Sequence, residues 1–164
     1  MREFVYPAKC VADGQDGAYV VSFRDIPEAI TQGNSVAECF DQAAVAIQAA
    51  LDGRIMDGLG IPAPSPAKRG ERLVAVPIQT ALKTALYLAI RERGITRVDL
   101  ARRLQIDEKE VRRMLDPYHA TKADRLEKAL AVLGKHAELR VARSQPCGRA
   151  YRPAAPLSSR RWMR

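Results

Sequence analysis

The stretch that decides the fold of the second half of this chain is RVDLARRLQIDEKEVRRMLDPYHATKADRLEKALAVLG, residues 97–134. Apolar residues recur in it at three- and four-residue steps, which is the spacing of helices with one buried face. Pairs that cap helix N-termini stand at the expected starts: Thr96 with Asp99, Asp107 with Glu110, and Thr121 with Asp124. Together with an apolar stripe over 79–94, the pattern predicts a bundle of short helices.

The helix expected after Thr96 and the helix expected from Asp107 to Pro117 are separated by only three residues, Gln-Ile-Asp. This spacing is typical of the helix-turn-helix motif. Ala101 offers the small residue needed where the two helices cross, and Ile106 offers an apolar plug. Gln105 is a departure, because glycine usually occupies this position and adopts the left-handed conformation there.

The second of these helices is the candidate DNA reader. If Val111, Met114 and Leu115 face the core, its charged residues face outward. Arginine and lysine can bind guanine edges or phosphates, and glutamate can accept from the cytosine amine. A solvated face with ordinary helical ion pairs is the alternative. The candidate DNA-binding residues are Arg97, Glu108, Lys109, Arg112, Arg113, His119 and Lys122.

The first half of the chain predicts strands rather than a helical bundle. A two-residue period places Tyr19, Val21 and Phe23 on one strand face, which packs either on a helix or on a partner. A helix starting at Ser35 and ending near Gly53 follows, and a proline-rich connector spans 60–70. The expected strands cover residues 3–12, 18–23, 29–33 and 72–78. The fold class is α+β, with one main helix on one face of a small sheet.

The charge is divided unevenly along the 164 residues. Residues 1–78 hold 7 basic and 10 acidic side chains, whereas residues 79–143 hold 15 and 9. We therefore expect two domains with these boundaries, the second attracted to a polyanion. Residues 144–164 add five arginines and no acid, and we expect a disordered tail that either contacts DNA or has no function.

Four carboxylates near the first hairpin raise the question of catalysis: Asp13, Asp16, Asp25 and Glu28. A metal-dependent nuclease would need such oxygens to converge on one side of a sheet. Turn geometry alone explains aspartate beside glycine, which favours a non-catalytic interpretation. A nuclease using Asp13, Asp16 and Asp25, and a repressor that senses a small molecule, remain the alternatives.

Cysteine usage and hydropathy indicate a cytoplasmic protein without a metal or cofactor. Cys10, Cys39 and Cys147 are scattered and lack metal-ligand spacing, so we expect reduced thiols. No apolar run reaches the length of a membrane span.

Two separate parts of the sequence resemble one family. The run FVYPAKCVADGQDGAYVVSFRDIPEAITQG at 4–33, with GIPAPS at 60–65, resembles the N-terminal domain of HicB-type antitoxins. Residues 97–134 resemble the helix-turn-helix version of the same family. The resemblance spans about residues 3–143, and Arg24 departs from it where the family usually has proline.

The resemblance implies a non-enzymatic protein with two partners. Its sheet would be a partial ribonuclease-H-like domain without working catalysis, which blocks a HicA-type mRNA-cleaving toxin. Its helical domain would bind operator DNA and repress the operon, as a homodimer or tetramer. The residues expected to contact the toxin are Tyr19, Phe23, Arg24, Asp25, Ile26 and Pro27.

Overall fold

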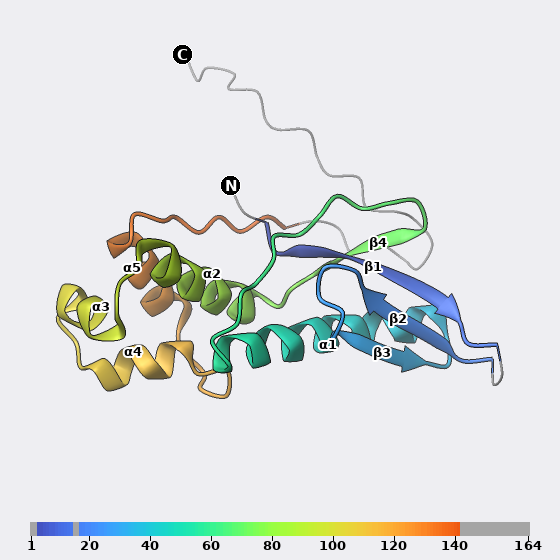
Figure 1. Ribbon diagram of the computed structural model, residues 1–164, viewed down its shortest axis with the longest axis horizontal. Coiled ribbons are helices and arrows are strands. Elements are labelled where there is room, and N and C mark those ends of the chain that lie inside the picture. Colours follow the sequence, from blue (N-terminus) through green and yellow to red (C-terminus); the bar gives the residue numbers. More distant parts are fainter. Residues whose placement is uncertain (1–2, 15–16, 142–164) are drawn as a thin grey trace, which may run out of the picture.

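The computed structural model describes residues 3–14 and 17–141. It has the expected mixed α+β composition, with a four-stranded sheet in the first half and helices in the second. In Figure 1 the molecule is elongated, with the sheet at one end and helices α3 and α4 at the other. The predicted tail at 144–164, Cys147 and the turn residue Asp16 lie outside the described residues.

All four predicted strands form one antiparallel sheet. In chain order they are β1 (Val5–Ala12), β2 (Tyr19–Phe23), β3 (Ile30–Gly33) and β4 (Glu71–Ala75). Their spatial order is β3-β2-β1-β4, so β3 is an edge strand as the sequence predicts. The hairpin between β1 and β2 places Cys10 opposite Val21 and Ala8 opposite Phe23.

Helix α1 (Val36–Met56) covers one face of this sheet. Strand alternation directs Val21 and Phe23 to that face, where both are buried. They pack with the helix stripe Cys39, Ala43, Ile47 and Leu51. The face shared by Tyr19, Val21 and Phe23 is therefore the face that packs on the core helix.

The prediction that Gly53 ends this helix is wrong. The helix continues one further turn to Met56, and Ile55 in that turn is buried. A glycine inside a helix costs about 1 kcal/mol relative to alanine, whereas burying an isoleucine side chain contributes about 1.5–3 kcal/mol. The added burial therefore outweighs the glycine.

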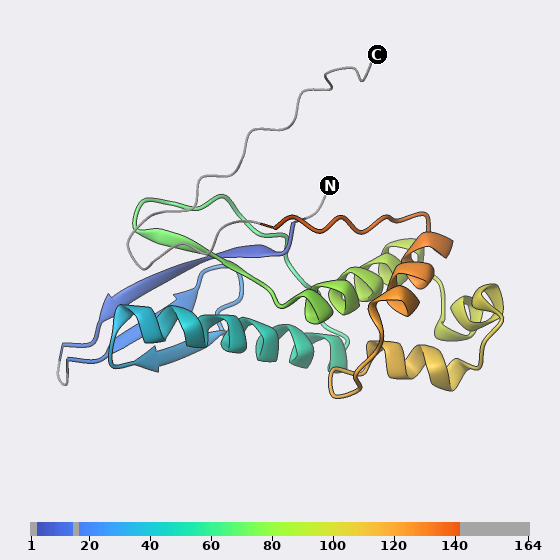
Figure 2. The same cartoon turned by 180° about the vertical axis from the view of Figure 1, so that it is seen from behind.

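The second half folds as four helices in the described part of the chain: α2 (Ile78–Arg93), α3 (Arg97–Leu104), α4 (Glu108–Leu115) and α5 (Ala123–Val132). Gly94 ends α2 with a φ of 59°, as predicted. The Thr96–Asp99 capping box is complete in both directions. Helices α2 and α5 pack side by side, and α3 packs on α4 (Figure 2).

Of the other two predicted capping pairs, one is half formed and the other is wrong. Asp107 caps α4 by accepting from the Lys109 amide, but the Glu110 side chain pairs with arginines instead. Thr121 does not cap α5, whose N-cap is Lys122. The Thr121 hydroxyl instead donates to the Arg113 carbonyl, because tertiary packing brings that acceptor close.

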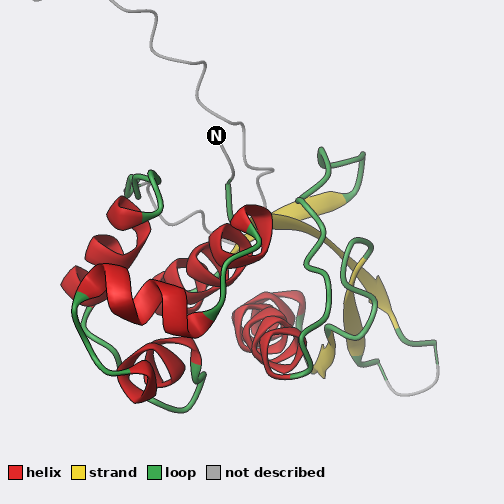
Figure 3. Ribbon diagram, turned by 60° about the vertical axis from the view of Figure 1, so that its left-hand side comes forward, coloured by secondary structure: helices red, strands yellow, loops and turns green. Residues whose placement is uncertain are grey.

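Helix α2 is buried on more of its surface than its apolar stripe predicts. Leu86, Ala89 and Ile90 are buried as expected, but Lys83 and Tyr87 are buried too. The reason is that α2 packs against α1 as well as α4 and α5. Figure 3 shows α1 end-on, with the sheet on one side and the other helices on the other.

Polar contacts join α2 to the segment that follows α1. The Tyr87 hydroxyl donates to the Leu59 carbonyl at 2.7 Å. Arg91 donates to the Gly58 carbonyl and, at 2.7 Å, to the Tyr87 hydroxyl. The buried apolar residues of the two halves accordingly form one continuous core.

The turn between α3 and α4 provides a test of local strain. Gln105 has a φ of 56° and is the only non-glycine residue with positive φ among residues 3–14 and 17–141. Because a side chain is disfavoured in this conformation, Gln105→Gly is expected to raise the free energy of unfolding by about 0.5–1 kcal/mol. Urea unfolding measures it.

Gln105→Ala is the matched control. It retains the Cβ atom at the left-handed position, so we expect no gain in stability from it. Equal unfolding midpoints for the glycine and alanine variants would contradict the strain argument.

Candidate DNA-contacting and partner-contacting surfaces

The segment from α3 to α4 is held by a tight turn. The Ile106 amide donates to the Ala101 carbonyl at 3.1 Å, closing the C-terminus of α3. Ala101 is 4% exposed at the helix crossing, and Ile106 is half-buried against the core. Val111, Met114 and Leu115 anchor α4 inward, as the sequence predicts. Both helices are thus fixed relative to each other.

The outer side of this helix pair carries most of the charged residues predicted for DNA. Glu108 is half-buried in the first turn of α4. The other six predicted residues are exposed: Arg97, Lys109, Arg112, Arg113, His119 and Lys122. Arg97 lies at the start of α3, away from the group that gathers after α4.

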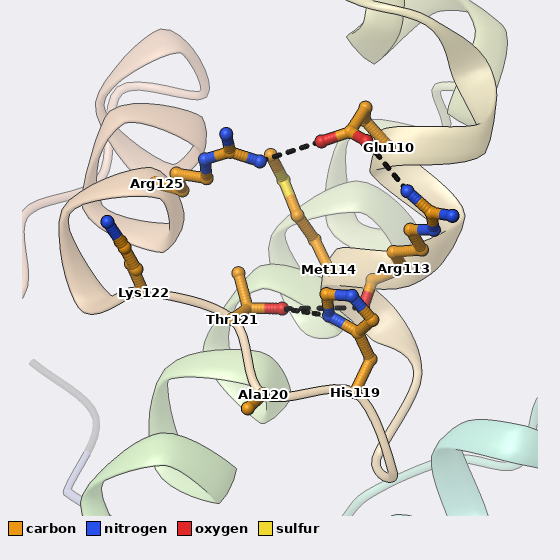
Figure 4. A pocket seen from close by; sticks show the side chains of 8 residues that line it. All are labelled: Glu110, Arg113, Met114, His119, Ala120, Thr121, Lys122 and Arg125. Carbon is orange, nitrogen blue, oxygen red and sulfur yellow. Dashed lines mark hydrogen bonds and ion pairs between the residues drawn. The ribbon is translucent and has the colours of Figure 1, made fainter.

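That group surrounds a pocket of about 230 Å³ between α4 and α5 (Figure 4). Three of the predicted residues line it, namely Arg113, His119 and Lys122. Arg125, which is not among the predicted residues, also lines it. Its position three residues after Lys122, on the same side of α5, is the signal that could have identified it.

One carboxylate holds two of the cations in this pocket. Glu110 pairs with Arg113 at 3.1 Å and with Arg125 at 2.7 Å (Figure 4). The His119 ring nitrogen Nδ1 lies 3.4 Å from the Thr121 hydroxyl. Three permanent cations and a histidine face one acid here, so the concave surface is positive and suited to an anion such as phosphate.

At the other end of the molecule, the corner after β2 is tied to the proline-rich connector. The Asp25 carboxylate accepts from the Ser65 amide at 2.8 Å and from its hydroxyl at 2.7 Å. Arg24 donates to the Ser65 hydroxyl at 2.6 Å and lies 3.5 Å from the Glu71 carboxylate. The corner is therefore shaped by contacts within the chain.

Two residues of the predicted toxin-contacting set are buried in the core. Phe23 and Ile26 are 1% and 0% exposed, so neither side chain is available on the surface. Strand alternation turns Phe23 toward α1, and the corner turns Ile26 inward. Tyr19 is half-buried on the α1 side, where its carbonyl accepts from the Cys39 thiol at 3.0 Å.

Arg24 and Pro27 stay on the surface. With Lys9, Ser22, Phe23 and Glu71 they line a shallow depression of about 360 Å³. Lys9 is paired with both Ser22 and Glu71 in the sheet, on the face opposite α1. The described residues thus offer an open sheet face with a depression at its corner.

Of the four carboxylates near the first hairpin, Asp25 and Glu28 are engaged by other groups of the chain, and Asp16 lies outside the described residues. Asp25 is occupied by Ser65, and Glu28 pairs with Arg54 in a bidentate contact. The Arg54 guanidinium lowers the pKa of Glu28 below its ordinary value. Within residues 3–14 and 17–141 no group of three metal-binding side chains converges. The geometry does not favour the nuclease alternative.

Comparison with known proteins places the chain in one family. A family described as "HicB_like antitoxin of bacterial toxin-antitoxin system" matches residues 5–85. "Antitoxin HicB" of Escherichia coli K12 is 40% identical over 124 residues, 76% of this chain and 90% of that protein. "Antitoxin HicB 1" of Photorhabdus laumondii is 35% identical, over 77% of this chain and 81% of the relative.

A more distant relative, "Antitoxin HicB" of Pseudomonas fluorescens, is 30% identical over 77% of this chain and 88% of its own length. These matches, over both the sheet and much of the helical part, define an antitoxin of the bacterial toxin–antitoxin class. The chain belongs to the HicB antitoxin family. None of the helices in the described residues is long and apolar enough to cross a membrane.

The contact between Asp25 and Ser65 yields a stability prediction. Asp25→Ala and Ser65→Ala are each expected to lower the free energy of unfolding by about 1–2 kcal/mol, because each removes hydrogen bonds in a half-buried site. The loss of unfolding free energy in the double variant should be smaller, by about 1 kcal/mol, than the sum of the losses in the two single variants. Urea unfolding of all four proteins measures this coupling.

Asp41→Ala is the control, since Asp41 is exposed on the outer side of α1. Its effect should add to that of Ser65→Ala without coupling. If the losses of unfolding free energy from Asp25→Ala and Ser65→Ala were simply additive, the contact between the connector and the corner after β2 would not stabilise the protein.

Proposed function

We propose that this chain binds and inhibits a HicA-type mRNA-cleaving toxin and represses its own operon by binding operator DNA. The observation that carries the antitoxin role is the match to "Antitoxin HicB" over 76% of the chain. The sheet with α1 on one face suits a partial ribonuclease-H-like domain that acts by binding, without catalysis. Both proposed partners are cytoplasmic, and so is the proposed location.

The proposed toxin-contacting surface is the open face of the sheet around Arg24 and Pro27. This face is supported by the depression there and by the absence of a packed helix on it among the described residues. Residues 1–78 carry a net charge of −3, from 7 basic and 10 acidic side chains. An acidic domain is complementary to a basic RNA-binding toxin, which favours fast and specific association.

Toxin inhibition is tested by RNA cleavage with purified toxin from the same operon. An equimolar amount of this chain is expected to suppress cleavage. Ser22→Tyr, which fills the depression, should weaken inhibition by about tenfold or more, because a clash opposes the partner. Cleavage that is unaffected by the wild-type chain would refute the antitoxin role.

Gln42→Tyr is the matched control, because it places the same ring on the exposed side of α1, away from the depression. It should inhibit like the wild type. Equal inhibition by all three proteins would leave the antitoxin role standing and exclude the open sheet face as the contact.

The proposed DNA-binding element is α3, the turn at Gln105 and α4, taken as a helix-turn-helix. Two observations support it: the left-handed turn residue and the outward direction of Lys109, Arg112 and Arg113. The positive pocket beside α4 would bind a backbone phosphate, while α4 would contact base edges and, through Arg112 and Arg113, the flanking phosphates. As a homodimer, or a tetramer built from two, the protein would place one such helix in each half-site.

Operator binding is tested with a duplex from the protein's own promoter at several salt concentrations. The double variant Arg112→Ala/Arg113→Ala should weaken binding and reduce the slope of log affinity against log salt by about 2 per chain, one unit per lost phosphate contact. Fluorescence anisotropy measures both quantities.

Lys68→Ala/Arg69→Ala removes the same charge from the exposed connector, far from α4, and should leave the slope unchanged. If both double variants lowered the slope equally, the effect would belong to net charge and not to the face of α4.

A further inference from the structure

Lys83, in the middle of α2, is a lysine that the proposed function does not yet use. Its side chain is 2% exposed, which is rare for an ammonium group. Its Nζ donates to the Asp116 carbonyl at 2.5 Å and to the His119 carbonyl at 2.6 Å. A longer contact of 3.4 Å reaches the Pro117 carbonyl. All three acceptors belong to the short loop that leaves α4.

The surroundings explain why the charge is tolerated inside the protein. Burial lowers the pKa of Lys83, and the nearby carboxylates of Asp52 and Asp116 act in the opposite direction. Asp116 is the C-cap of α4, so the ammonium lies at the negative end of that helix. Asp52 comes from α1 in the sheet-bearing half of the chain, and burial raises the pKa of its carboxyl group.

A second residue of α2 holds the far end of the same loop. Gln79, one helical turn before Lys83, donates its side-chain amide to the Thr121 carbonyl at 3.2 Å. Two side chains four residues apart on one helix therefore anchor the loop at both ends. His119 is itself one of the anchored residues, and Lys122 directly follows Thr121, so the anchored loop supplies part of the positive pocket beside α4.

We propose that Lys83 is a positioning residue for DNA recognition. Its ammonium fixes residues 116–119 and the C-terminal end of α4, and so sets the geometry in which Arg113, His119 and Lys122 meet the DNA backbone together. Lys83 itself is too buried to touch DNA. This inference rests on the proposed operator binding and assigns it a determinant outside the contacting surface.

The test compares specific with non-specific binding by the full chain. Lys83→Met removes the ammonium but keeps an unbranched apolar stem of similar length, and it leaves every exposed cation in place. Non-specific affinity follows surface charge, whereas specific binding needs all contacts aligned. We expect the ratio of operator to random-duplex affinity to fall by about tenfold, with random-duplex affinity unchanged.

Lys128→Met is the matched control, because Lys128 is exposed on α5 outside the pocket. It should preserve the ratio. Amide hydrogen exchange over 116–122 should accelerate in Lys83→Met only, which ties the lost specificity to a released loop. Circular dichroism and thermal unfolding establish that each variant is folded at the assay temperature.

If Lys83→Met does not fold, Gln79→Ala tests the same anchor more gently, since Gln79 is exposed and alanine suits a helix. We expect a fall of about threefold in the same ratio, from one lost neutral hydrogen bond. If Lys83→Met is folded and keeps the wild-type ratio of operator to random-duplex affinity, the proposal is overturned. If Lys83→Met is unfolded, a wild-type ratio in Gln79→Ala overturns it instead. A wild-type chain without specific operator binding overturns the DNA-binding function and this inference with it.

Discussion

Helix α2 packs against α1 of the first half and against α4 and α5 of the second half at the same time. The rest of the architecture depends on this constraint. Leu86, Ala89 and Ile90 bury one side of it in the shared core. Tyr87 binds the backbone of the segment after α1, and Lys83 binds the loop after α4. A helix with both kinds of contact cannot move with one half alone. The two parts, although opposite in charge, form one packed unit in the described residues.

The sequence predicts what depends on local periodicity and fails where distant residues decide. The strands, the buried stripe of α4 and the Thr96–Asp99 box are all encoded within a few residues, and all are confirmed. The helix end at Gly53 and the Thr121 cap are wrong because tertiary partners offered a better alternative. Lys83 gave no signal, since its acceptors lie 33 to 36 residues away.

The candidate surfaces also contain some features that local periodicity predicts and others that distant residues decide. Exposure on α4 could be predicted, because the inward direction of Val111 and Met114 fixes the outward direction of its arginines. The corner after β2 could not be divided into buried and exposed residues, because Pro27 breaks the strand period that would have done so. Phe23 and Ile26 belong to the core, and the connector that engages Asp25 lies 40 residues further along the chain.

The geometry also constrains how the two proposed activities coexist. The open sheet face and α4 lie at opposite ends of the molecule, so a toxin and an operator would not compete for the same surface on one chain (Figure 1). Any effect of one partner on the other has to pass through packed elements between them. Helix α1 supports the sheet, contacts α2 and brings Asp52 near the Lys83 ammonium. Lys83 also holds the end of α4, so the same side chain connects the surroundings of α1 to the loop after α4.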